Sequence, residues 1–364
     1  MHGRRKVALL VAMVVMVLGV QRAAAQAPSV TVSGVAYLKY YYFLKDSAGK
    51  NNFDIDRAYL NVNGKFAHGI TTRITSDLFR PASGTSIDNS LALRIKYAYV
   101  GWTPEKSPLT VKMGVTQTPW LDWEEALWDY RQQGTMAMER TGYLSSSDLG
   151  LSLDGNFNYD QFNFTTGVYN GENYSGFPGD QGKDFMARAS FRFIKTDVPP
   201  QDVSATGGRG PTAPTPSRVG GLRLTGYAQI GRPTTGGTRQ RYIGLLSYRS
   251  NLLTLAGEWA ATTDSSLAGK NAYQKKGTVG SVYGVLRVPN SGFSLMARYD
   301  VIDPDTKASR DRQDRVIAGA SYTVSSNLRI LADVDAVTYQ DDNYPSAAAK
   351  SARTQALLQV QFSF

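Results

Sequence analysis

The sequence predicts an all-β fold: a transmembrane antiparallel β-barrel of sixteen strands with one inward-folded constriction loop. Three observations lead to this prediction. Short segments of alternating apolar and polar residues follow one another along most of the chain, the connections between them alternate in length, and the last segment ends in an aromatic residue, Phe364. Such segments form strands with one apolar and one polar face.

The first 25 residues have the features of a cleavable signal peptide. Basic residues at positions 4–6 precede an apolar run at 7–20, and three alanines at 23–25 supply small residues for cleavage. An uncleaved membrane anchor is the alternative, but this run is shorter than the roughly 20 residues of a spanning helix. We therefore expect export, removal of residues 1–25, and a single barrel domain over residues 26–364.

Composition excludes several kinds of chemistry. The chain has no cysteine, which rules out disulfides and sulfur-ligated zinc. Its formal net charge of +10 becomes +6 when the four basic residues of the leader are removed, so a basic excess remains. His68 is the only histidine left after cleavage, which disfavours serine–histidine catalysis, and no phosphate-cradling glycine loop or metal cluster is evident. We expect no enzymatic activity, no cofactor and no nucleic-acid partner.

Alternation with a period of two locates the strands. One segment, for example, places Leu93, Ile95, Tyr97 and Tyr99 on an apolar face, opposite Arg94 and Lys96. A soluble β-sandwich would alternate in the same way. Sixteen such segments are predicted, near residues 30–44, 53–66, 70–80, 91–103, 109–118, 148–157, 160–170, 184–194, 221–231, 240–250, 252–262, 277–288, 293–302, 313–324, 328–338 and 351–364.

The lengths of the connections favour a membrane barrel over a sandwich. Outer-membrane barrels have short turns at the periplasmic rim and long loops at the external rim, whereas a sandwich has no reason to sort its loops by parity. In this chain tight turns at 67–69, 289–292 and 325–327 alternate with longer loops at 81–90, 263–276, 303–312 and 339–350.

Two segments interrupt the pattern. Residues 119–147 follow the fifth strand and contain three tryptophans, and we expect them to fold into the lumen as a constriction loop. A surface loop with a short helix is the alternative. Residues 196–220 are rich in proline and glycine, which predicts a flexible insertion. Strand parity assigns this insertion to the rim of short turns, where a long segment is unusual.

Basic side chains gather on the predicted polar faces. A charge facing hydrocarbon would cost about 2 to 4 kcal/mol at the membrane midplane, so these side chains should line the lumen. There they would act on every passing ion, because the Debye length of about 8 Å is comparable to the radius of a constricted pore. We predict a path that favours anions, and its expected lining residues are Arg57, Arg73, Arg94, Lys96, Lys112, Arg140, Arg188, Arg192 and Arg223.

Further arginines fall on the same polar faces, among them Arg315 and Arg329. Acids such as Asp77 and Asp335 also fall there. The alternative to anion preference is therefore a lumen in which acids balance the cations and set a transverse field.

Several stretches resemble a known family. They are FDIDRAYL at 53–60, MER at 138–140, GVYNG at 167–171, and DFMAR at 184–188 with the following Phe191-Arg192. In order and spacing they are similar to the phosphate-selective porin O and P family of Gram-negative bacteria. The resemblance covers most of the mature chain and implies a trimeric, sixteen-stranded porin of the outer membrane.

In that family, phosphate is held by arginines and lysines at the constriction, including basic residues on the loop after the ninth strand. Here that loop, residues 232–239, is short and contains no lysine. This departure leaves the substrate open.

We therefore expect a porin in the Gram-negative outer membrane for passive diffusion of small anions, with phosphate or polyphosphate as candidate substrates. The alternatives are a general-diffusion porin with little ion selectivity and a barrel that is not a channel, such as an adhesin or an enzyme. Expected partners are small inorganic or organic anions, outer-membrane lipids, the barrel assembly machinery, and further copies of the chain in a homotrimer.

Overall fold

The computed structural model describes residues 27–81, 90–176, 181–196, 220–233, 236–266, 273–343, 345–346, 349–350 and 353–364. The predicted signal peptide, residues 1–25, and most of the predicted insertion, residues 197–219, lie outside these ranges. None of the helices in the described ranges is both long and apolar enough to cross a lipid bilayer.

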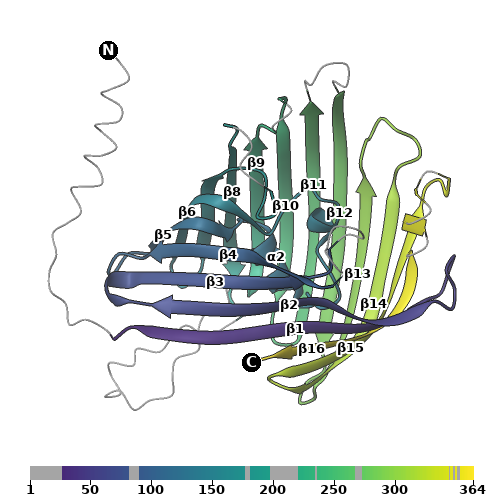
Figure 1. Ribbon diagram of the computed structural model, residues 1–364, viewed down its shortest axis with the longest axis horizontal. Coiled ribbons are helices and arrows are strands. Elements are labelled where there is room, and N and C mark those ends of the chain that lie inside the picture. Colours follow the sequence, from purple (N-terminus) through teal and green to yellow (C-terminus); the bar gives the residue numbers. More distant parts are fainter. Residues whose placement is uncertain are drawn as a thin grey trace.

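The described residues form sixteen antiparallel strands that close into a barrel (Figure 1). Each strand pairs with its neighbours in sequence, and the first strand pairs with the last, so the sheet has no free edge. The predicted fold class is confirmed. The strands are β1 (Ser29–Phe43), β2 (Asn51–Lys65), β3 (Ile70–Phe79), β4 (Ala92–Trp102), β5 (Leu109–Gln117), β6 (Ser147–Phe157), β7 (Phe162–Tyr169), β8 (Asp184–Ile194), β9 (Gly221–Gly231), β10 (Arg239–Arg249), β11 (Leu253–Ser266), β12 (Tyr273–Arg287), β13 (Phe293–Asp303), β14 (Gln313–Ser325), β15 (Leu328–Tyr339) and β16 (Thr354–Ser363).

Apart from the connection between β8 and β9, residues 195–220, the connections sort by length as predicted. Tight turns such as η1 (Ala67–Gly69), between β2 and β3, lie at one end of the barrel, which we call the short-turn rim. The opposite end is the long-loop rim. The loop expected at 263–276 is shorter than predicted, because β11 and β12 remain paired up to Ser266 and Tyr273. Backbone pairing continues there beyond the apolar belt, where side-chain alternation no longer marks a strand.

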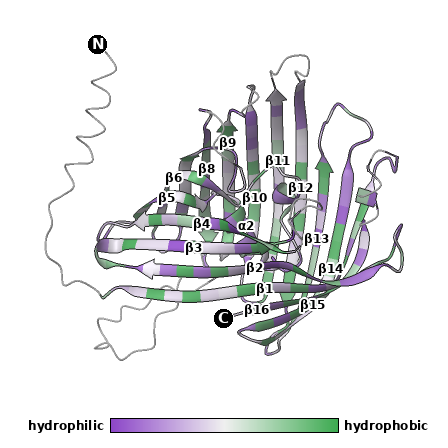
Figure 2. Cartoon of the chain, in the orientation of Figure 1, coloured by the Kyte–Doolittle hydropathy of each residue, from purple (hydrophilic) through white to green (hydrophobic). Residues whose placement is uncertain are grey.

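The outer face of the barrel is apolar. Leucine, valine and isoleucine side chains point outward from successive strands, and Figure 2 shows apolar and polar residues alternating along them. Aromatic residues collect near the short-turn rim, where such rings favour the boundary between lipid and water. Those exposed there are Phe66, Trp102, Phe162, Phe191, Phe193, Phe293, Tyr322, Phe362 and Phe364.

A β-bulge in β4 changes which side chains face the interior. Opposite it, Thr75 of β3 pairs with Tyr97 and Ser76 pairs with Ile95, so Lys96 is the extra residue. Lys96 and Tyr97 are both buried inside the barrel, and Tyr99 follows Tyr97 on the same face. The prediction that Tyr97 and Tyr99 lie on the apolar outer face is therefore wrong, because one extra residue moves every later side chain to the other face.

Candidate functional site

Residues 118–146, between β5 and β6, lie inside the barrel, as predicted for the inward-folded loop (Figure 1). They contain two short helices, α2 (Leu121–Trp128) and α3 (Ala137–Arg140). Trp120 packs against Tyr227 of β9 with ring centroids 5.6 Å apart, and Trp128 packs against Tyr283 of β12 at 5.3 Å. Both tryptophans are completely buried, so apolar burial attaches the loop to this side of the wall.

Side chains of other strands hold the loop by its backbone. Arg188 of β8 donates to the carbonyl of Pro119 at 3.0 Å, and Arg298 of β13 donates to the carbonyl of Thr135 at 3.2 Å. Gln359 of β16 donates to the carbonyl of Gln132 at 2.8 Å. The loop is therefore anchored from β8 around to β16, and open space remains between α2 and the wall formed by β1 to β5.

Three adjoining cavities occupy this space. The upper cavity, about 390 Å³, lies toward the long-loop rim, the middle cavity is about 320 Å³, and the lower cavity, about 270 Å³, lies toward the short-turn rim. Arg131 lines both the upper and the middle cavity, and Asp122 lines both the middle and the lower one. The cavities thus follow one another past α2.

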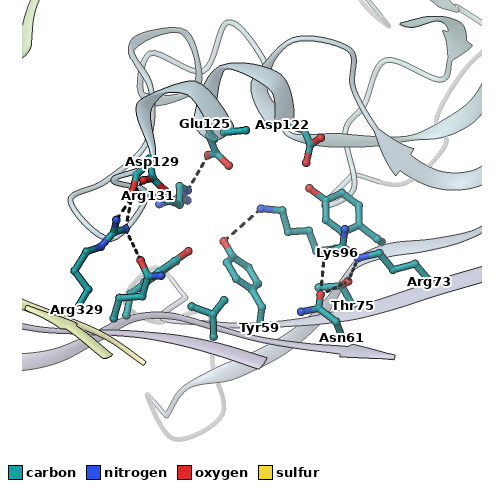
Figure 3. A pocket seen from close by; sticks show the side chains of 15 residues that line it. Tyr59, Asn61, Arg73, Thr75, Lys96, Asp122, Glu125, Asp129, Arg131 and Arg329 are labelled. Atoms are coloured by element: carbon teal, nitrogen blue, oxygen red, sulfur yellow. Dashed lines mark hydrogen bonds and ion pairs between the residues drawn. The ribbon is translucent and has the colours of Figure 1, made fainter. Parts of the chain in front are cut away.

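In the middle cavity the acids of the loop, together with Arg131, lie opposite the cations of the barrel wall. Figure 3 shows Asp122 and Glu125 of α2 facing Tyr59, Lys96 and Arg73 of the barrel wall. Its charged lining residues are Arg73, Lys96, Arg131, Arg329, Asp122, Glu125 and Asp129.

Arg73 and Lys96 are held without a carboxylate. Arg73 donates to Thr75 Oγ1 and Asn61 Oδ1, both at 2.9 Å, while its guanidinium lies 4.6 Å from the ring centroid of Tyr97. Lys96 Nζ lies 3.3 Å from the Tyr59 hydroxyl and 4.6 Å from the Tyr59 ring centroid. Within the described ranges, neither side chain forms an ion pair.

Three other predicted cations face the lumen but are paired. Arg57 and Arg94 share the buried carboxylate of Asp77, at 3.0 and 2.9 Å. Lys112 lies 2.7 Å from Asp154 in the lower cavity. Asp154 compensates the charge of Lys112, whereas the one carboxylate shared by Arg57 and Arg94 compensates only one of their two charges.

Arg140, predicted to project from the loop, lines the upper cavity from α3. Its Nη1 atom lies 3.6 Å from Asp300. Nearby, Arg315 makes two hydrogen bonds of 2.6 Å to the carboxylate of Asp335. Arg140 thus lies at the edge of the upper cavity, with Asp300 as its partner.

The remaining three predicted cations hold the structure together. Arg188 lines the lower cavity, but its guanidinium anchors the loop. Arg192 and Arg223 face the barrel interior and are completely buried. Arg192 donates to the carbonyl of Tyr159, and Arg223 pairs with Asp160, so both secure the turn between β6 and β7. Neither lines any of the three cavities.

Five cavity-lining cations were absent from the predicted path: Lys39, Arg80, Arg131, Arg315 and Arg329, of which Arg315 and Arg329 were expected on the polar faces. Lys39 of β1 lies 2.7 Å from Asp56, and the run Tyr40-Tyr41-Tyr42 hides the alternation that would have placed it on the polar face. Arg131 belongs to the loop, where no period exists to orient it. Its Nε atom lies 2.8 Å from Glu125 Oε1.

The pKa of Glu125 is perturbed. Burial raises it to about 7, against the opposing effect of the Arg131 guanidinium. The carboxyl group of Glu125 therefore changes charge near neutral pH.

Comparisons with known proteins agree with this architecture. A family model described as phosphate-selective porin O and P matches residues 37–245. No curated protein matches the sequence.

Among solved structures, the anion-selective porin from Comamonas acidovorans is 12% identical, covering 93% of this chain and 100% of its own, with a TM-score of 0.63. Salmonella typhi OmpF in complex with daunomycin is 13% identical, and the match covers 92% of this chain and 97% of OmpF with a TM-score of 0.64. OmpT of Vibrio cholerae is 13% identical, and the match covers 94% of this chain and 100% of OmpT with a TM-score of 0.60. At such identities these structures show the fold alone. Because the family match spans more than half of the chain, this protein belongs to the phosphate-selective porin O and P family and is an outer-membrane porin.

Proposed function

We propose that this porin is a passive channel that prefers small anions. The observation that carries the proposal is the excess of cations in the upper and middle cavities. In the middle cavity four basic side chains face three acids. In the upper cavity six cations accompany three acids: Lys39, Arg57, Arg80, Arg131, Arg140 and Arg315 against Asp54, Asp56 and Asp335.

Arg73 and Lys96 contribute most to this preference, because no carboxylate neutralises them. An anion entering from the long-loop rim would meet the basic upper cavity and then these two side chains. Such contacts bind strongly enough to draw the ion in and weakly enough to release it. We accordingly assign the anion path to Arg57, Arg73, Lys96, Lys112 and Arg140, with Arg188 as an anchor of the loop; Arg94 faces the barrel interior but lines none of the three cavities.

A general-diffusion porin is the second candidate, and two observations favour it. The acids of α2 face the cations of the wall across the middle cavity, which is the arrangement of a transverse field. In the lower cavity Lys112 and Arg188 accompany three acids, so the cationic excess ends there. A lumen dominated by these features would show little selectivity.

The reversal potential of the purified porin in planar bilayers, under a tenfold KCl gradient, separates the two candidates. We expect the sign of chloride preference. A potential near zero would favour general diffusion, and cation preference would overturn the proposal. Absence of conductance would point to a barrel that is not a channel. Block of the chloride current by phosphate tests phosphate as the substrate.

We also propose that the chain is exported with loss of residues 1–25 and assembles as a homotrimer. The leader sequence supports export, and one solved structure with this fold, OmpT of Vibrio cholerae, is described in a trimer form. N-terminal sequencing of the outer-membrane protein should begin near residue 26. Unboiled samples should migrate on gels at about three times the mass of the boiled chain, and migration as a monomer would contradict the trimer.

A further inference from the structure

The middle cavity combines unpaired cations with tyrosine rings, and we propose that it binds aromatic carboxylates such as benzoate. The carboxylate would lie at Lys96 and Arg73, and the ring would lie against Tyr59 and Tyr97. This inference rests on the proposed anion preference and names the class of organic anion that the same path favours.

The first observation is a buried charge without a counter-ion. Lys96 is only 5% exposed and has no carboxylate within ion-pair distance in the described ranges. A buried charge is costly unless it is paired and hydrogen-bonded. The Tyr59 hydroxyl and ring offset part of that cost. An incoming anion would supply the missing partner.

The second observation is the aromatic surface beside that charge. Tyr37, Tyr59 and Tyr97 all line the cavity, and the rings of Tyr37 and Tyr59 meet edge to face with centroids 6.1 Å apart. Tyr97 lines the cavity because the bulge in β4 turns its side chain inward, directly beside Lys96. Ring and ammonium group therefore arise from consecutive residues of one strand.

The third observation is the stacking of the cations on these rings. The Arg73 guanidinium lies 4.6 Å from the Tyr97 ring centroid, and Lys96 Nζ lies 4.6 Å from that of Tyr59. A planar aromatic anion can extend such a layer, since its ring stacks on tyrosine or guanidinium while its carboxylate meets the cations. Inorganic phosphate would use the charges but none of the aromatic surface.

Size and charge also fit a monoanion with one polar end. The cavity volume of about 320 Å³ is within the range of small-molecule sites. Asp122 and Glu125 on the opposite side would repel a second carboxylate and so orient a single one toward the wall. The same pairing of cation and ring recurs at Lys112, which lines the lower cavity and lies 5.6 Å from the Tyr99 ring centroid. Repeated weak sites let a ligand move on rather than remain bound.

The test compares benzoate with cyclohexanecarboxylate, which has the same charge and nearly the same size but no aromatic ring. Each is titrated as a blocker of the single-channel chloride current of the full porin. We expect benzoate to reach half-block at a concentration roughly three- to tenfold lower, the factor that one aromatic pair supplies. Tyr97→Leu should abolish the difference, and Arg73→Gln should weaken block by both acids.

Two further variants guard against a folding defect. Tyr97→Phe keeps the ring and should retain the preference for benzoate. Tyr299→Leu alters a tyrosine exposed on the outer face. Benzoate and cyclohexanecarboxylate should block this variant at the same concentrations as the wild type. An anion-preferring channel that is blocked equally by the two acids would overturn this inference and leave the proposed function standing. Cation preference would overturn both.

Discussion

Replacing Lys96 by glutamine removes one positive charge from a cavity in which four cations face three acids. A monovalent ion passing at about 4 Å from that charge gains or loses about 1 kcal/mol in water. Screening with a Debye length of about 8 Å lowers this energy to about 0.6 kcal/mol. The anion loses that attraction and the cation loses an equal repulsion, so the permeability ratio of anion to cation should shift by about 1.2 kcal/mol, roughly eightfold.

The assay is the reversal potential of wild type and Lys96→Gln in the same KCl gradient, measured at low and at high salt. The shift should shrink as salt rises, because screening is stronger there. Lys307→Gln, at an exposed position of the long-loop rim, is the matched control and should leave the potential unchanged. An unchanged potential in Lys96→Gln, or a stronger anion preference, would refute the assignment of Lys96 to the path.

Three further predictions concern the loop, its acid edge and the short-turn rim. Trp128→Ala should release part of the loop from Tyr283, at a packing cost of about 3 to 5 kcal/mol, and raise single-channel conductance; an unchanged conductance would show that this contact does not hold the loop. Because burial raises the pKa of Glu125 to about 7, that acid is charged above pH 7 and neutral below it. Lowering the pH from 8 to 6 should therefore increase anion preference, and Glu125→Gln should remove this pH dependence of the reversal potential. Asp160→Asn leaves the buried Arg223 without its partner and should cost about 3 to 5 kcal/mol of stability. Unfolding of the barrel in unboiled gels should move to lower temperature in this variant, and an unchanged unfolding temperature would contradict the stabilising role of this ion pair.

The fold could be predicted from sequence because each strand carries its own signal. Lipid on one side of the sheet and water on the other make apolar and polar side chains alternate along each strand. In a closed membrane barrel the short turns lie at one rim and the long loops at the other. The same reasoning placed the basic side chains inside, since none of them could remain in hydrocarbon. It failed at Tyr97 and Tyr99, because a single extra residue in β4 reverses the pattern without interrupting it.

The candidate site could be predicted only in part. The inward position of Arg73, Lys96 and Arg140 follows from strand parity and from the inserted loop. Their partners do not follow, because an ion pair depends on strand register and on where the loop attaches. Asp77 thus pairs with both Arg57 and Arg94 from β3, between the two strands that carry them, while Arg223 reaches Asp160 across 63 residues of sequence.

By itself, the sequence determined that this chain forms a membrane barrel with charged side chains in its interior, because alternation, loop parity and the cost of charge in lipid act on each segment separately. The tertiary structure alone decided which cations stay unpaired and which rings stand beside them. The pairing of these cations and rings depends on the closed barrel, on the bulge at Lys96, and on a loop anchored on the opposite wall. Each of these features brings together residues that are distant in the chain.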